Sequence, residues 1–130
     1  MKNKFDPRHL KRIANIQALF AWSCGNNAPV TEDTPNIINV IPEIDQIIQT
    51  NAPKWPIDKI NRVDLNILRY AFWELFYYKK NPTKVVIDEV IEIAKEYGTD
   101  TSSSFINGVI GTALKKNEST SWRTPTIDKL

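Results

Sequence analysis

The sequence is poor in the residues that build disulfides, metal centres and phosphate loops. Its 130 residues include one cysteine, one histidine and four glycines. Cys24 has no second cysteine with which to form an internal disulfide, so the cytoplasm is the expected compartment. A zinc site of the usual kind needs more cysteine and histidine ligands than Cys24 and His9 can supply. We therefore expect neither a metal nor a cofactor.

The patterns of an enzyme or a membrane protein are also missing. The sequence contains no glycine-rich phosphate loop and no nucleophile elbow. No apolar run approaches the roughly 18 residues that span a bilayer, and the charged N-terminus lacks the apolar region of a signal peptide. Asp88, Glu89, Glu92 and Glu96 recur at helical spacing among polar positions, which is typical of a solvated helix face. We expect a non-catalytic protein without a membrane segment.

What the sequence does contain is helical periodicity. From residue 60 to residue 114, apolar residues recur at three- and four-residue steps, which predicts amphipathic helices. Asn81-Pro82 is predicted to end the first of them, since a residue before proline is pushed out of the helical region. A second periodic segment covers residues 37–48, with Pro42 as its start or as a kink. No alternating strand pattern persists, so the predicted fold class is all-α.

Glycine and tryptophan give further expectations about packing. Gly98 is placed where a left-handed helix cap is wanted. Gly108 and Gly111 lie inside a predicted helix, where glycine costs about 1 kcal/mol relative to alanine. A close approach of another helix is the expected reason for both. Trp55, between two prolines, is expected to anchor the core.

The N-terminal segment is basic. Asp6-Pro7 predicts the start of a helix, in which Arg8, Lys11 and Arg12 lie opposite the apolar side. Gln17 falls within the apolar side and is expected to be buried and hydrogen-bonded. Residues 1–22 hold five basic residues and one acidic residue, whereas residues 23–50 hold four acidic residues and no basic one. This asymmetry suggests a local anionic partner.

Two interpretations of the basic face remain open. It is either a solvated helix surface or a phosphate-binding surface that Lys2 and Lys4 extend. RNA binding also needs exposed aromatic rings, because single-stranded bases stack on them. Phe20 and Phe105 are the candidates, although either one alone is more often a core residue.

Five stretches of the sequence form a recognisable set. They are ILRYAFWEL (67–75), KVVIDEVIEIAKEYG (84–98), SSSFINGVIG (102–111), WPIDKINRVD (55–64), and the first-helix pattern with Arg8, Arg12 and QALF (17–20). In this order and spacing they resemble the NusB family of transcription antitermination factors. The resemblance implies two packed helical bundles in one domain over residues 1–116, with sub-bundles at about 6–54 and 55–116 and a flexible tail at 117–130. The stretch between Trp22 and Trp55 is shorter than is typical, so the N-terminal bundle is expected to be shortened, with one helix missing or replaced by a linker over 23–36.

The resemblance also implies a function. Members bind boxA-type single-stranded RNA together with NusE, a ribosomal protein, and help to form an RNA polymerase antitermination complex in ribosomal RNA transcription. By position, Arg8 and Arg12 match the arginine-rich motif, Phe20 and Phe105 match aromatics at the RNA surface, and Asp64 matches an acidic residue that faces NusE. Together with the charge pattern, the expected RNA-binding set is Lys2, Lys4, Arg8, Lys11, Arg12, Phe20 and Phe105.

Two other functions fit the same residues. One is a NusB-like protein-interaction module that has lost RNA binding and keeps only the NusE contact. The other is a NusB-like RNA-binding domain of the lineage of ribosomal RNA methyltransferases, although no methyltransferase domain is expected in these 130 residues. Some relatives self-associate through the RNA face, so a homodimer is left open.

Overall fold

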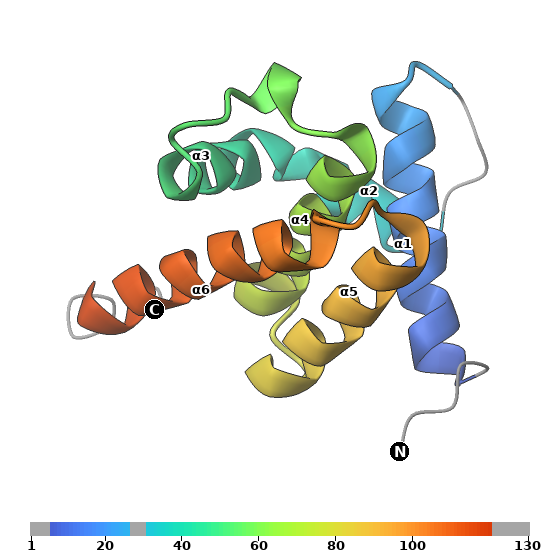
Figure 1. The fold of residues 1–130 in the computed structure, drawn as a ribbon. Helices are drawn as coiled ribbons and strands as arrows, with labels where there is room; N and C mark the ends of the chain where they lie inside the picture. The colour runs from blue at the N-terminus through green and yellow to red at the C-terminus, as the bar shows by residue number, and fades with distance from the viewer. Residues whose placement is uncertain (1–5, 27–30, 121–130) are drawn as a thin grey trace.

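The computed structural model describes residues 6–26 and 31–120. Within these ranges the chain forms six α-helices and no β-strand (Figure 1). The helices are α1 (Pro7–Ser23), α2 (Thr34–Asn39), α3 (Ile41–Asn51), α4 (Arg62–Trp73), α5 (Thr83–Tyr97) and α6 (Ser102–Thr120). A 3-10 turn, η1 (Ile57–Lys59), precedes α4, and a π-helical turn, η2 (Glu74–Tyr78), follows it. The all-α class predicted from the sequence is confirmed.

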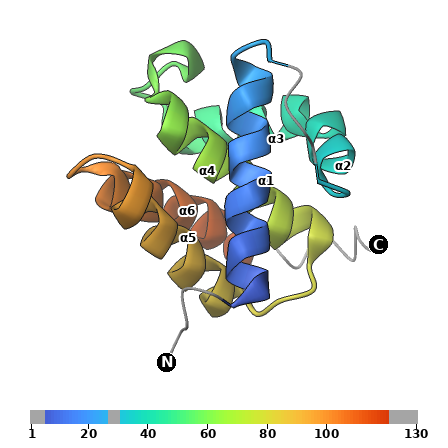
Figure 2. The same ribbon diagram turned by 90° about the vertical axis from the view of Figure 1, so that its right-hand side faces the viewer.

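Helix α4 lies at the centre of the fold. It contacts α1, α3, α5 and α6, and its residues 64–73 are all buried. Asn61 begins the helix, because its side chain accepts hydrogen bonds from the backbone N–H groups of Val63 and Asp64 at 2.8 and 3.2 Å. Figure 2 shows α1 in front of this centre, with α5 and α6 on one side and α2 on the other.

One continuous hydrophobic core joins the N-terminal and C-terminal helices. Its fully buried side chains include Leu19, Ile37, Ile44, Ile48, Ile67, Phe72, Val90, Ile106 and Ile110. Burying a side chain of this size contributes about 1.5–3 kcal/mol relative to leaving it exposed. Because α4 packs against helices of both predicted sub-bundles, the two share this core.

Three helices, α1, α2 and α3, precede Trp55. The segment predicted over residues 37–48 is divided at Val40 into α2 and α3. Pro35 and Pro42 each lie in the first turn of their helix, where the missing N–H costs little. Helix α2 has only six residues.

The π-helical turn η2 ends the central helix earlier than the sequence predicts. Lys79 adopts a left-handed backbone conformation (φ 58°), and its N–H donates to the carbonyl of Glu74 at 3.0 Å. Lys79 therefore stops the helix two residues before Asn81-Pro82, and Pro82 then serves as the N-cap of α5.

Four packing expectations are wrong. The side chain of Trp55 is 53% exposed and is not a core anchor. Gly98 has φ −95°, so no left-handed cap forms; a Cβ there would lie 2.7 Å from the carbonyl oxygen of Ala94 and against Ser102 Oγ. Gly108 and Gly111 face open space, so no helix approaches them.

Helix α6 reaches beyond the start of the predicted tail. Its backbone is helical to Thr120, so four of the residues assigned to a tail over 117–130 belong to the helix. Residues 121–130 lie outside the described ranges. Across the part of the chain that the structure describes, no helix combines the length and the apolar character needed to cross a membrane.

Candidate RNA and protein interface

The first turn of α1 presents Arg8 to solvent. Asp6 caps the helix by accepting a hydrogen bond from the Arg8 backbone N–H at 2.8 Å, and Pro7 follows it in the first turn. The Arg8 guanidinium folds back on the same carboxylate, with Nη2 3.1 Å from Oδ2. The side-chain hydrogen bond from Arg8 lowers the pKa of Asp6. Because the Arg8 side chain is 79% exposed, its charge remains accessible to a polyanion.

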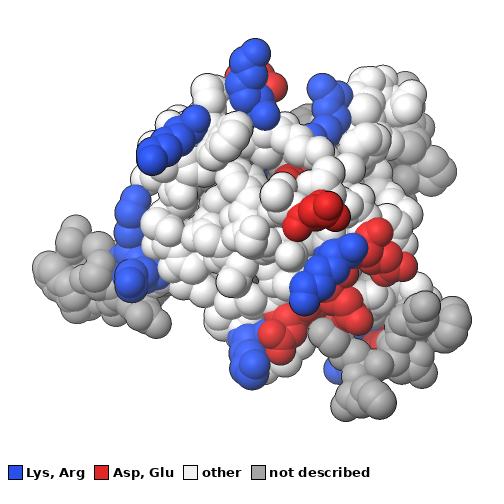
Figure 3. Space-filling view, viewed as in Figure 1, with Lys and Arg blue, Asp and Glu red and all other residues white. Residues whose placement is uncertain are grey.

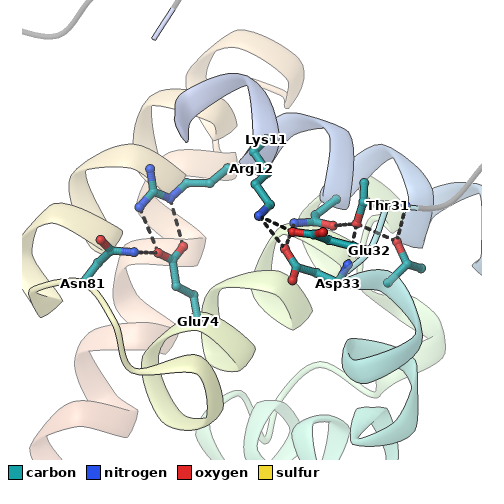
Figure 4. Close-up of polar contacts among 9 residues, drawn as sticks. Lys11, Arg12, Thr31, Glu32, Asp33, Glu74 and Asn81 are labelled. Atoms are coloured by element: carbon teal, nitrogen blue, oxygen red, sulfur yellow. Dashed lines mark hydrogen bonds and ion pairs between the residues drawn. The ribbon is translucent and has the colours of Figure 1, made fainter. Parts of the chain in front are cut away.

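Lys11 lies one turn further along α1 and points toward the residues that precede α2 (Figure 4). Its ammonium is 3.2 Å from Glu32 and 3.4 Å from Asp33. The hydrogen bond to Glu32, followed by the charge of Asp33, raises the pKa of Lys11. Asn15 donates to Asp33 at 3.3 Å and holds that carboxylate in place. Glu32 is 81% exposed, so salt weakens its hold on Lys11 and a phosphate can replace it.

Arg12 does not lie on the exposed basic face that the sequence predicts. Its side chain is 6% exposed and binds Glu74 through two hydrogen bonds, Nε to Oε1 at 2.9 Å and Nη2 to Oε2 at 2.8 Å (Figure 4). Burial alone would lower the pKa of Arg12, but the hydrogen bonds and charge of Glu74 outweigh it and the pKa is raised. Asn81 donates to the same carboxylate at 2.7 Å. Arg12 therefore fastens α1 to the turn after α4.

A second buried acid completes this cluster. Glu89 was expected on the solvated face of α5, but only 5% of the residue is exposed. Its Oε1 lies 2.7 Å from His9 Nδ1 and 3.4 Å from Arg12 Nη1. His9, Glu89 and Glu92 together offer three potential metal-ligating atoms within 4.8 Å of one another. The guanidinium beside Glu89 would repel a metal ion, so this arrangement favours an internal ion-pair network.

Of the other acids predicted on the solvated face of α5, Asp88 and Glu96 are exposed as expected, whereas Glu92 is half-buried. Figure 3 shows acidic and basic side chains interleaved over α5. Lys84 lies 3.5 Å from Asp88 one turn away. A face of mixed charge offers RNA little net attraction, so the N-terminal half of α1 is the better location for a phosphate contact.

Phe20 lies on the rim of an apolar groove formed by α1, α4 and α5. The residue is 38% exposed, and the groove has a volume of about 200 Å³. Ile16 and Ile67 contribute to its lining, and Tyr97 lies on the rim at 47% exposure. Gln17 also lines the groove and is exposed, so the expectation of a buried amide is wrong. The exposed rings of Phe20 and Tyr97 are accessible to a base or to an apolar side chain.

Asp64 and Phe105 meet in a separate groove of about 590 Å³ between η1, α4 and α6. Trp55 packs edge-on against Phe105, with the ring centroids 6.3 Å apart at 79°. Asp64 is 6% exposed, and among the described residues its Oδ1 has no hydrogen-bond donor. Burial raises the pKa of Asp64, while a hydrogen bond with the side chain of Ser102 acts in the opposite direction. The groove thus holds an incompletely satisfied carboxylate beside two aromatic rings.

The predicted site residues therefore fall into three groups. Arg8 and Lys11 share a pocket with Arg12, Phe20 lies in the apolar groove, and Asp64 lies with Phe105. Lys2 and Lys4 are outside the described residues. Sequence reasoning missed Trp55 as a surface residue, although its two flanking prolines signal an exposed turn. It also missed Glu74, which carries no local signal because its partner Arg12 is 62 positions away.

Comparison with known proteins gives the same assignment along most of the chain. The model of the NusB family matches residues 26–115. A protein of Treponema denticola named "Transcription antitermination protein NusB" is 38% identical over 132 aligned positions, which cover 85% of this chain and 97% of that protein. A protein of the same name from Finegoldia magna is 44% identical, over 66% of this chain and 63% of the relative. Other relatives of that name are matched over about half their length.

Solved structures show the same fold. T. maritima NusB superposes with a TM-score of 0.73 at 31% identity, covering 89% of this chain and 94% of that one. A structure described as antitermination factors NusB and NusE in complex with double-stranded RNA gives a TM-score of 0.71 at 22% identity, which shows the fold alone. With the family model, a relative matched along nearly its whole length and the shared fold in agreement, this chain belongs to the NusB family.

Proposed function

We propose that this chain is a non-catalytic transcription antitermination factor that works in the bacterial cytoplasm. It binds boxA-type single-stranded RNA together with the ribosomal protein NusE and joins an RNA polymerase antitermination complex during ribosomal RNA transcription. The observation that carries the proposal is the match to a transcription antitermination protein NusB over 97% of that protein's length. A protein of the same fold has been solved with NusE and with double-stranded RNA, which is in keeping with a NusE partner and an RNA partner.

The RNA contact is assigned to the exposed part of α1 and to the aromatic rings of Phe20 and Phe105 at the two grooves. Arg8 is the most accessible cation there, and Lys11 becomes available when phosphate replaces Glu32. Phe20 and Phe105 supply rings for stacking, which is tolerant of base identity. Arg12 supports this surface from inside by holding α1 in place.

Fluorescence anisotropy with a labelled boxA-type RNA, with and without NusE, tests this assignment. For single-stranded RNA, each lost phosphate contact lowers the slope of log affinity against log salt by about 0.7. We expect Arg8→Ala to lower the slope by about this amount. Lys84→Ala, an equal loss of charge on the mixed face of α5, should leave it unchanged. Equal effects of the two substitutions would show that α1 has no special role.

The NusE contact is assigned to the groove that contains Asp64. A buried carboxylate without a full set of donors is costly alone. A cationic side chain of a partner would complete it after the groove opens around Asp64. Asp64→Lys should therefore abolish NusE binding in calorimetric titration. Asp100→Lys, on the exposed turn between α5 and α6, is the matched control. NusE affinity that survives Asp64→Lys would remove Asp64 from the interface.

A second candidate function is a protein-interaction module that has lost RNA binding. The observation that favours it is the neutralisation of the basic face, since Arg8 and Lys11 pair with Asp6, Glu32 and Asp33 while Arg12 is buried. The same titrations separate the two functions. NusE binding without any effect of added RNA, even at low salt, would establish the interaction module.

A further inference from the structure

The π-helical turn after α4 forms one wall of a pocket whose other wall is the N-terminal half of α1. The pocket has a volume of about 170 Å³. Four cations line it, Arg8, Lys11, Arg12 and Lys80, with two carboxylates, Asp33 and Glu74. Three further carboxylates, Asp6, Glu32 and Glu89, pair with Arg8, Lys11 and Arg12 from outside the lining, so the cation that bears on ligand binding is the one that has no acid beside it.

Both carboxylates of the lining are already bound to cations. Glu74 takes two hydrogen bonds from Arg12, and Asp33 lies 3.4 Å from Lys11. Lys80 differs from the other cations of the pocket, because no carboxylate of the described residues lies within 4.0 Å of its ammonium. Its contact is with the Tyr78 ring, 5.1 Å from the centroid, a weak attraction that a phosphate would surpass.

The position of Lys80 relative to α1 is fixed by Glu74. This buried carboxylate binds Arg12 on α1 and also accepts a hydrogen bond from Asn81, the neighbour of Lys80. Tyr78 stacks on Trp73 with centroids 4.8 Å apart, which anchors the other side of the turn. The two walls are therefore held at a set spacing before any ligand arrives, which reduces the ordering cost of binding.

We propose that this pocket binds a phosphodiester group of the RNA, with Lys80 as its unassigned cation opposite Arg8 and Lys11. The inference rests on the proposed RNA-binding function and extends the RNA contact from α1 to the turn between α4 and α5. Lys80 is an RNA-contacting residue in this assignment, whereas Glu74 and Asn81 position it.

The test measures RNA affinity of the full chain with NusE at several salt concentrations. Lys80→Ala should lower the salt slope by about 0.7, which corresponds to about a fivefold loss of affinity at 0.1 M salt that vanishes near 1 M. Lys80→Arg should retain the parent slope. Lys84→Ala removes a lysine from the adjoining α5 and should leave the slope unchanged.

A double-mutant cycle with Arg8→Ala tests whether both cations bind one phosphate. Shared contact predicts that the double variant loses less affinity than the two single losses combined. Additive losses, or equal effects of Lys80→Ala and Lys84→Ala, would overturn the assignment of this pocket as a phosphodiester site. If Arg8→Ala weakens binding and Lys80→Ala does not, this inference alone fails. If the parent chain binds no RNA at low salt, the proposed function fails with it.

Discussion

The buried pair between Arg12 and Glu74 gives the strongest test of the structure. Arg12→Ala leaves Glu74, at 1% exposure, with the neutral Asn81 amide and Tyr70 hydroxyl as side-chain donors and no cation. Removing one partner of a buried ion pair typically costs about 3–5 kcal/mol, because the other charge stays uncompensated. Domains of this kind have a free energy of unfolding of about 5–15 kcal/mol, so the loss is a large fraction of the total.

The loss should be visible in both thermal and chemical unfolding. In a domain of this size, each kcal/mol of lost stability lowers Tm by about 3–5 °C, so we expect Tm to fall by roughly 10–20 °C. Circular dichroism melts with urea titrations would measure it. The destabilisation should persist in high salt, since a buried pair is poorly screened.

Two further variants make the outcome decisive. Glu74→Gln keeps the shape of the side chain and removes the charge, and the double variant Arg12→Ala/Glu74→Gln should be less destabilised than the sum of the single variants. A Tm for Arg12→Ala within about 2 °C of the parent, with weakened RNA binding, would refute this reasoning. It would show that the Arg12 charge is used at the surface, as the sequence alone predicts.

Two other predictions concern stability. The pKa of Asp64 is higher in the folded chain than its ordinary value of 3.8, so stability falls as pH rises from 3.8 through the folded-state pKa. Asp64→Asn should therefore be more stable than the parent at pH 7. Denaturant titrations should show that this advantage fades below about pH 4. Gly98→Ala should lower Tm, because the new Cβ meets the Ala94 carbonyl. Gly108→Ala lies on an open helix surface and should raise the free energy of unfolding by about 0.5–1 kcal/mol. If both variants shifted Tm in the same direction, the described surroundings of these glycines would be contradicted.

Local signals predicted much of the fold. The 3.6-residue period of apolar residues identified α4, α5 and α6, and Pro82 marked the start of α5. Proline at a helix start also explains why residues 34–51 form two helices. These features depend on neighbours in the chain, so they can be read from the sequence.

Buried charges could not be predicted in the same way. Arg12 and Arg69 fall outside the apolar stripes, yet both are buried because acids reach them from other helices. Glu74 is 62 positions from Arg12, and Asp45 is 24 positions from Arg69, which it binds at 2.9 Å. A hydropathy scale gives an arginine the same value whether or not an acid pairs with it. The burial of Arg12 and Arg69 therefore becomes visible only when α1 and α3 are packed onto α4.

The site was predicted in part for the same reason. The family motifs pointed to Asp64 and Phe105 as contacts for two different partners, and they did not predict that both residues line one groove. Lys80 was not found, because its relation to Arg8 depends on the π-helical turn, which has no recognised sequence signal.

The ion pairs of α1 also bear on how this chain can be divided. The stretch that the family model recognises begins at residue 26, after α1 has ended. A fragment starting there keeps five helices but loses Arg12 and His9, the cationic and imidazole partners of Glu74 and Glu89. It also uncovers the side of α4 against which Leu19 is buried. The autonomous folding unit is therefore larger than the recognised family region, and a peptide of α1 supplied in trans would be the natural complement to such a fragment.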